Sequence, residues 1–113
     1  MPKRADIDCL NDIKEAIRRI NIYIENLSYE QFLEDLKTED AVVRNLEVIG
    51  EAAKNISEEL KRKYSQIPWK DLAGVRDRLI HHYFGVNFDI VWDIAKKELP
   101  AITLQVEEIL KIG

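Results

Sequence analysis

One short stretch of the chain combines arginines, histidines and a tyrosine at close spacing. It reads Arg76-Asp77-Arg78-Leu79-Ile80-His81-His82-Tyr83, and it holds both histidines of the chain. From residue 61 to residue 83, six lysines and arginines stand against two aspartates, although the whole chain has a formal charge of −4. A local cationic region on an acidic protein is expected where a phosphate-bearing ligand binds at one place. The basic run at 61–63 could instead be a solvated helix end.

Helices must position these residues, because apolar side chains recur at helical spacing nearly throughout the chain. One stripe runs from Leu10 to Leu27 and a second from Val42 to Leu60, both in steps of three and four residues. Thr38 is an N-cap candidate for the second helix, which the basic run at 61–63 would close.

Two further helices are expected in the second half of the chain. The third is predicted from about Asp71 to Tyr83, with Gly85 placed to end it. The fourth begins at Asn87 or Asp89, and we expect a kink or a break where it passes through Pro100. The break in pattern at 64–70 leaves room for a short helical turn.

These elements predict an all-α fold, an antiparallel bundle of four main helices with a short extra helical turn. The 113 residues fit a single domain, 1–113. No apolar run approaches the roughly 20 residues of a membrane span, and no signal peptide opens the sequence, so we expect a cytoplasmic protein with no membrane partner. The single cysteine, Cys9, excludes an internal disulfide and is compatible with a reducing compartment.

Arg76 is the unusual residue of the third helix. On an ideal helix Leu72, Val75, Leu79 and Tyr83 define one apolar arc, and Arg76 is expected within it. Burying an unpaired guanidinium is costly. Arg76 therefore either pairs with a carboxylate, for which Glu47 or Glu51 is available, or points into a cleft or a subunit seam.

The stretch from Arg76 to Tyr83 resembles the R-x4-H-x-Y motif of HEPN-domain ribonucleases, specifically of the HepT-like toxin subgroup. Three longer blocks are similar to that subgroup and fall in the expected order: RNLEVIGEAAKNI (44–56), IPWKDLAGVRDRLIHHYFG (67–85) and VWDIAKKELP (91–100). The resemblance therefore covers essentially the whole chain.

The resemblance implies a helical-bundle homodimer in which motif residues of both chains line one cleft. It further implies a toxin that cleaves RNA without a metal or cofactor. The implied partner is an MntA-type minimal nucleotidyltransferase antitoxin, which attaches AMP to the motif tyrosine. Carried over to this sequence, Arg76 and His81 are the catalytic pair and Tyr83 is the modified residue. Asp77, Arg78 and His82 are supporting residues, and Asp77 stands where the family usually has a small polar residue.

The residue types suit that chemistry. Cleavage by internal attack needs a base near the 2′-OH, an acid near the leaving oxygen and positive charge on the phosphate. Histidine titrates near neutral pH, and arginine presents a permanently charged donor fork to phosphate oxygens. A two-fold dimer would supply two copies of His81. On an ideal helix, however, His81 lies about 140° round from Arg76, so either the helix is distorted near its end or the pair forms between subunits.

The same residues admit other interpretations. His81, His82 and Cys9 are too few and too scattered for a zinc site. The carboxylates at 47, 51, 58 and 59 are typical of a solvated helix face, Trp69 and Trp92 of packing, and Tyr83 could be an ordinary half-buried aromatic. The alternative function is a non-catalytic helical module that docks a nucleotidyltransferase and binds nucleotide. A bundle without any site would leave Arg76 unexplained.

Overall fold

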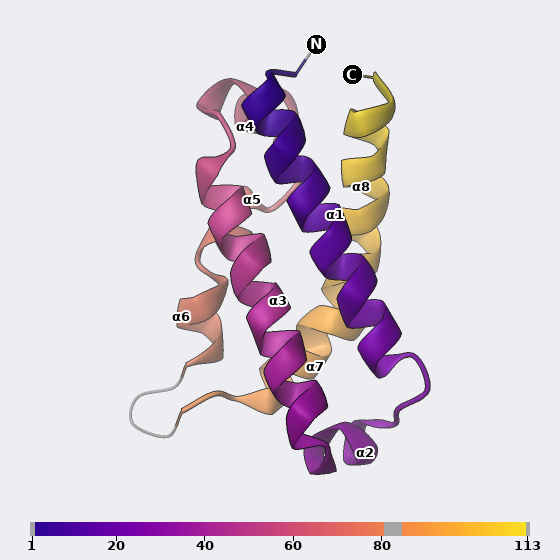
Figure 1. The fold of residues 1–113 in the computed structure, drawn as a ribbon. Helices are drawn as coiled ribbons and strands as arrows, with labels where there is room; N and C mark the ends of the chain where they lie inside the picture. Colours follow the sequence, from indigo (N-terminus) through magenta and orange to yellow (C-terminus); the bar gives the residue numbers. More distant parts are fainter. Residues whose placement is uncertain (1, 81–84, 113) are drawn as a thin grey trace.

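The structure is a computed structural model that describes residues 2–80 and 85–112, and it confirms the all-α fold. Three long helices form the body of the bundle: α1 (Arg4–Ile24), α3 (Leu36–Asn55) and α8 (Leu99–Ile112). Shorter elements connect them: α2 (Tyr29–Glu34), α4 (Glu58–Lys63), α5 (Trp69–Ala73), α6 (Val75–Leu79), α7 (Phe88–Asp93) and the π-helical turn η2 (Ile94–Glu98). Helix α1 runs antiparallel to both α3 and α8, and the two ends of the chain lie at the same end of the bundle (Figure 1).

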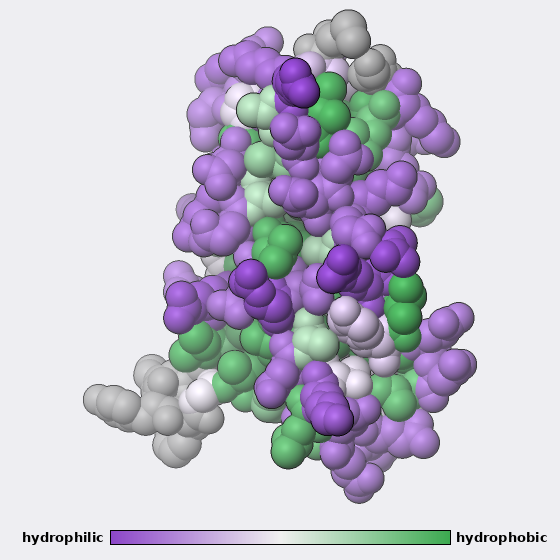
Figure 2. All heavy atoms as spheres, in the orientation of Figure 1, coloured by the Kyte–Doolittle hydropathy of each residue, from purple (hydrophilic) through white to green (hydrophobic). Residues whose placement is uncertain are grey.

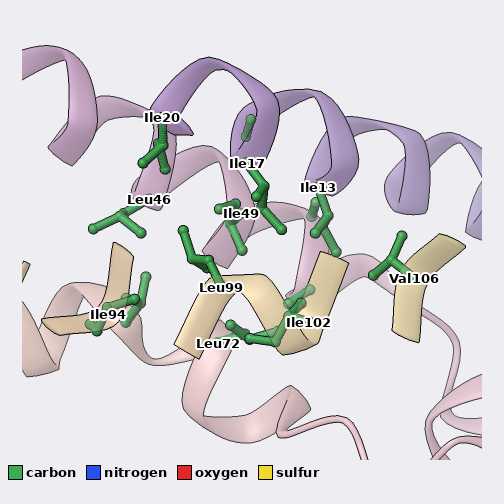
Figure 3. Packing of buried hydrophobic residues seen from close by; sticks show 14 of the residues in the cluster. Ile13, Ile17, Ile20, Leu46, Ile49, Leu72, Ile94, Leu99, Ile102 and Val106 are labelled. Atoms are coloured by element: carbon green, nitrogen blue, oxygen red, sulfur yellow. The ribbon is translucent and has the colours of Figure 1, made fainter. Parts of the chain in front are cut away.

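The predicted apolar stripes form the core. Ile13, Ile17 and Ile20 of α1 point toward Leu46 and Ile49 of α3 and toward α8 (Figure 3). The α8 stripe lies on the other side of the same cluster, and its buried members are Leu99, Ile102, Val106 and Ile109. The face that carries α1 and α3 is covered mainly by hydrophilic side chains (Figure 2). Among the described residues, no helix is both long and apolar enough to cross a membrane.

Two boundaries of the second predicted helix are wrong. Its N-cap is Asp35 rather than Thr38, because the Thr38 backbone N–H donates to Asp35 Oδ1 at 3.1 Å and the Thr38 hydroxyl donates to Oδ2 at 2.7 Å. These hydrogen bonds lower the pKa of Asp35. The helix also ends at Asn55 instead of continuing to Lys63, since Ile56 has an extended backbone.

A buried carboxylate explains that break. Ser57 caps α4 by accepting a hydrogen bond from the Leu60 N–H, and it donates its own N–H and hydroxyl to Asp6 at 2.8 and 2.6 Å. Asp6 belongs to α1 and is only 3% exposed. The end of α3 is therefore set by a partner at the far end of the sequence, which local periodicity does not reveal.

The third predicted helix is shorter than expected and is divided in two. Gly74 separates α5 from α6, and α6 ends at Leu79, since Ile80 is extended and forms an isolated antiparallel bridge with Val86. Gly85 therefore does not end this helix. It has φ +78° and precedes Val86 in the bridge.

The fourth helix confirms two predictions. Asn87 is its N-cap, accepting hydrogen bonds from the N–H groups of Asp89 and Ile90. The irregularity expected at Pro100 takes the form of the π-helical turn η2, in which the Leu99 N–H donates to the Ile94 carbonyl. Proline has no N–H to donate, so a wider turn just before it accommodates the missing hydrogen bond.

Candidate active site

Close packing between α3 and the α5–α6 junction places Arg76. Gly50 is buried in α3, and a Cβ atom added there would lie 3.0 Å from Val75 Cγ1 and 3.1 Å from the Leu72 carbonyl oxygen. Both distances are tighter than ordinary side-chain contacts, so any larger residue at position 50 would press on α5 and α6. Val75 and Leu79 are buried and anchor α6 against the core, whereas Arg76 is exposed. The core therefore holds the backbone of α6 in place, while the side chain of Arg76 stays accessible to solvent.

The exposed side chain of Arg76 lines a polar pocket between α3 and α6. One face of α3 supplies most of this pocket, at the helical spacing 44, 47, 51 and 54. Its lining residues are Arg44, Glu47, Gly50, Glu51, Lys54, Ala73, Val75 and Arg76. We call it the α3–α6 pocket.

The pocket decides between the alternatives for Arg76. The arginine shares the pocket with Glu47 and Glu51, the two carboxylates expected as partners, but it forms no ion pair with any carboxylate in the described part of the chain. Arg76 is therefore not a buried, paired cation. The expectation that it lies within the apolar arc is wrong, because α6 buries only Val75 and Leu79.

Arg78 makes a different contact. Its guanidinium donates two hydrogen bonds to Glu98, from Nη1 to Oε1 at 3.0 Å and from Nη2 to Oε2 at 2.8 Å. The pKa of Arg78 is raised, above all by these hydrogen bonds. The pair ties α6 to η2 across 20 residues of sequence, and nothing in the local sequence pattern points to Glu98 as the partner. Arg78 thus holds α6, the helix that carries Arg76, against η2.

The remaining motif residues divide into two groups. Asp77 is exposed in the first turn of α6. His81, His82 and Tyr83 lie outside the described residues, so only their flanks are known. The Asn87 N–H donates to the Leu79 carbonyl at 2.7 Å, and Ile80 pairs with Val86. The motif therefore begins on α6 and continues past the end of the helix, so the ideal-helix separation of 140° between Arg76 and His81 does not apply.

The tryptophans and the basic run at 61–63 lie away from the α3–α6 pocket. Trp69 is buried and donates to the Tyr64 carbonyl, and Trp92 packs on Phe32, so both tryptophans have the expected packing role. The basic run at 61–63 closes α4, at the opposite end of the bundle from α7, and is not part of the α3–α6 pocket. Within residues 2–80 and 85–112, no three His, Cys, Asp or Glu residues are grouped so as to hold a metal ion.

One residue of this pocket, Arg44, was not predicted from the sequence. It is exposed on α3 and lines the same pocket as Arg76. The sequence feature that could have pointed to Arg44 is its position at the start of the block 44–56, which carries the family resemblance. Its place beside Arg76 depends on how α3 packs against α6, which the sequence alone does not give.

The protein is thus an all-α bundle in which an accessible arginine begins an R-x4-H-x-Y stretch. Comparison with known proteins identifies the family: the profile described as Ribonuclease HepT-like matches residues 13–109. The chain therefore belongs to the HepT-like ribonuclease family.

Individual relatives agree with this assignment. The chain is 44% identical to a protein of Thermococcus cleftensis named "Probable ribonuclease HepT", over 96% of this chain and 99% of that protein. It is 47% and 48% identical to two proteins of Methanocaldococcus jannaschii, each named as a candidate RNase, over 98% of this chain and 92% of each of those proteins. No solved structure matches the chain.

Proposed function

We propose that this chain is the toxin of a toxin–antitoxin pair and acts as a metal-independent endoribonuclease. The observation that carries the proposal is the position of Arg76, which is exposed in a polar pocket at the start of the family motif and pairs with no carboxylate in the described ranges. A guanidinium held in this way is available to a phosphate group. Membership of the HepT-like family and the RNase names of its relatives support RNA as the substrate.

The proposed reaction is internal transesterification. The RNA 2′-oxygen attacks the adjacent phosphorus, its proton passes to one His81 imidazole, and the bond from phosphorus to the 5′-oxygen breaks. A second, protonated His81 gives a proton to that leaving oxygen, so the products carry a 2′,3′-cyclic phosphate and a 5′-hydroxyl. Arg76 stabilises the negative charge that builds on the phosphate oxygens.

This scheme requires a homodimer. Base and acid must stand on opposite sides of the phosphorus, and each chain has one motif histidine at position 81. Two copies related by a two-fold axis supply both groups from one gene product. Arg76 and His81 from the two subunits then face a shared groove.

We also propose that an MntA-type nucleotidyltransferase antitoxin neutralises the toxin by modifying Tyr83. The tyrosine oxygen attacks the α-phosphate of ATP, the bond to the pyrophosphate breaks, and AMP remains on Tyr83. The modification adds negative charge and bulk seven residues from Arg76. It would compete with RNA for the same cationic groups and so block the site.

The proposal is tested with the full chain, purified free of its partner and incubated with total RNA in chelator. Wild type should cleave the RNA, Arg76→Ala and His81→Ala should lose at least about a hundredfold in rate, and Arg62→Ala, which removes an exposed cation from α4, should retain full activity. If wild type and both site variants are equally inert, the nuclease proposal fails, and the alternative of a non-catalytic module that docks a nucleotidyltransferase takes its place.

A further inference from the structure

We propose that Arg44 is a second phosphate-binding residue of this site and holds an RNA phosphate next to the one that is cleaved. The inference rests on the proposed function and extends it, because it assigns a substrate contact to α3, outside the R-x4-H-x-Y stretch. Arg44 is exposed and lines the α3–α6 pocket together with Arg76.

The direction of the helices places Arg44 on the motif side of the pocket. Gly50 of α3 faces Leu72 and Val75, and α6 runs antiparallel to α3 (Figure 1). Arg44 lies six residues before Gly50, about 9 Å along the α3 axis at 1.5 Å per residue. This is the direction in which α6 runs from Val75 to Leu79. Arg44 therefore lies toward the Leu79 end of α6, the helix that carries Arg76.

The charges of the pocket favour an anion at this place. Lys54 pairs with Glu51, with 3.5 Å between Nζ and Oε1. That pair leaves two guanidinium groups, of Arg44 and Arg76, against the single carboxylate of Glu47. Neither arginine forms an ion pair with a carboxylate in the parts of the chain that the structure describes.

A single RNA strand presents phosphates in succession, and two cations in one pocket can contact two of them. Arginine suits this role because its planar donor fork matches phosphate oxygens. Contacts of this kind position the strand without reading its bases. Arg44 should thus increase the affinity for RNA of any sequence and help to position the strand along the pocket.

The test uses the full chain with His81→Ala as background, so that the RNA stays intact, and a labelled single-stranded RNA of mixed sequence as probe. Affinity is measured over a range of salt concentrations for Arg44→Gln, for Glu47→Gln and for the matched control Arg62→Gln. Arg62 is an exposed cation of α4 outside the pocket. Thermal unfolding of each variant reports separately on the fold.

Arg44→Gln should weaken binding roughly three- to tenfold and reduce the salt slope of log K by about 0.7, the value for one phosphate of a single strand. Glu47→Gln should bind more tightly than the background, and Arg62→Gln should match it. Equal affinity and slope for Arg44→Gln and Arg62→Gln would overturn the inference, and so would weaker binding by Glu47→Gln, which would indicate a structural network.

The two proposals fail in different ways. If wild type cleaves RNA but Arg44→Gln binds like the Arg62 control, the inference on Arg44 falls alone. If wild type leaves RNA uncut while binding still depends on Arg44, the nuclease proposal falls and the phosphate contact stands. Absence of any RNA binding by the His81→Ala chain, together with uncut RNA in the wild-type assay, would overturn both proposals.

Discussion

Arg78 and Glu98 form a bidentate ion pair that joins α6 to η2, with N–O distances of 3.0 and 2.8 Å. The two side chains are 35% and 37% exposed. This contact fixes the short helix that carries Arg76 to the turn that precedes Pro100. A short α-helix and a π-helical turn thus stabilise each other beside the candidate active site.

Replacing Arg78 with alanine should therefore lower the free energy of unfolding by about 1 kcal/mol. A partly buried ion pair with two parallel hydrogen bonds stabilises a fold more than an ordinary surface pair does. Urea denaturation of Arg78→Ala, Glu98→Ala and the double variant measures the coupling, which we expect at about 0.5–1 kcal/mol. A coupling of zero would show that the pair does not hold α6 in solution.

Ser57→Ala should destabilise the chain by roughly 1–2 kcal/mol. The substitution removes the cap of α4 and leaves the buried Asp6 carboxylate with one hydrogen bond fewer. Chemical denaturation measures the loss, and Ser65→Ala, at an exposed position after α4, is the control. Equal stability of the two variants would contradict the role assigned to Asp6.

Gly50→Ala should separate α3 from α6. Overpacking against Val75 and the Leu72 carbonyl costs about 1–3 kcal/mol, more than the gain of up to about 1 kcal/mol in helix propensity. We expect a lower melting temperature and, because Arg76 moves with α6, slower RNA cleavage in the soluble fraction. A variant as stable and as active as wild type would show that the approach at Gly50 is not needed.

Glu39 predicts a pH dependence of stability. Burial raises the pKa of this carboxyl, and the nearby Asp40 and Asp35 raise it further. A raised pKa in the folded state means that ionisation at neutral pH destabilises the fold, and that the penalty disappears as pH falls below the unfolded value near 4.5. Glu39→Gln should thus be more stable than wild type at pH 7.

The advantage of Glu39→Gln should shrink as the pH falls toward 4, which thermal unfolding across pH can follow. Glu34→Gln, at an exposed position of α2, serves as the control. An advantage that is constant with pH would mean that ionisation of Glu39 is not its cause.

Local sequence predicted those features that local physics determines. The stripes of α1, α3 and α8 follow from helical periodicity, and the Asn87 cap follows from side-chain chemistry at a helix start. The break at Ser57 was missed because Asp6, its partner, is 51 residues away.

The candidate site, too, could be predicted from the sequence only in part. The motif type and spacing singled out Arg76 from sequence, and family resemblance gave it a role. Its accessibility, the pocket that it shares with Arg44, and the contact between Arg78 and Glu98 all depend on how α3, α6 and η2 pack. Because such contacts join distant segments, periodicity and spacing could not supply them.

The most direct test of the central claim is to identify by mass spectrometry the ends of RNA fragments made by the purified chain in chelator. The account predicts 2′,3′-cyclic phosphate and 5′-hydroxyl ends from wild type, and no such fragments from Arg76→Ala or His81→Ala. Fragments with other ends, or the same fragments from either variant, would contradict it.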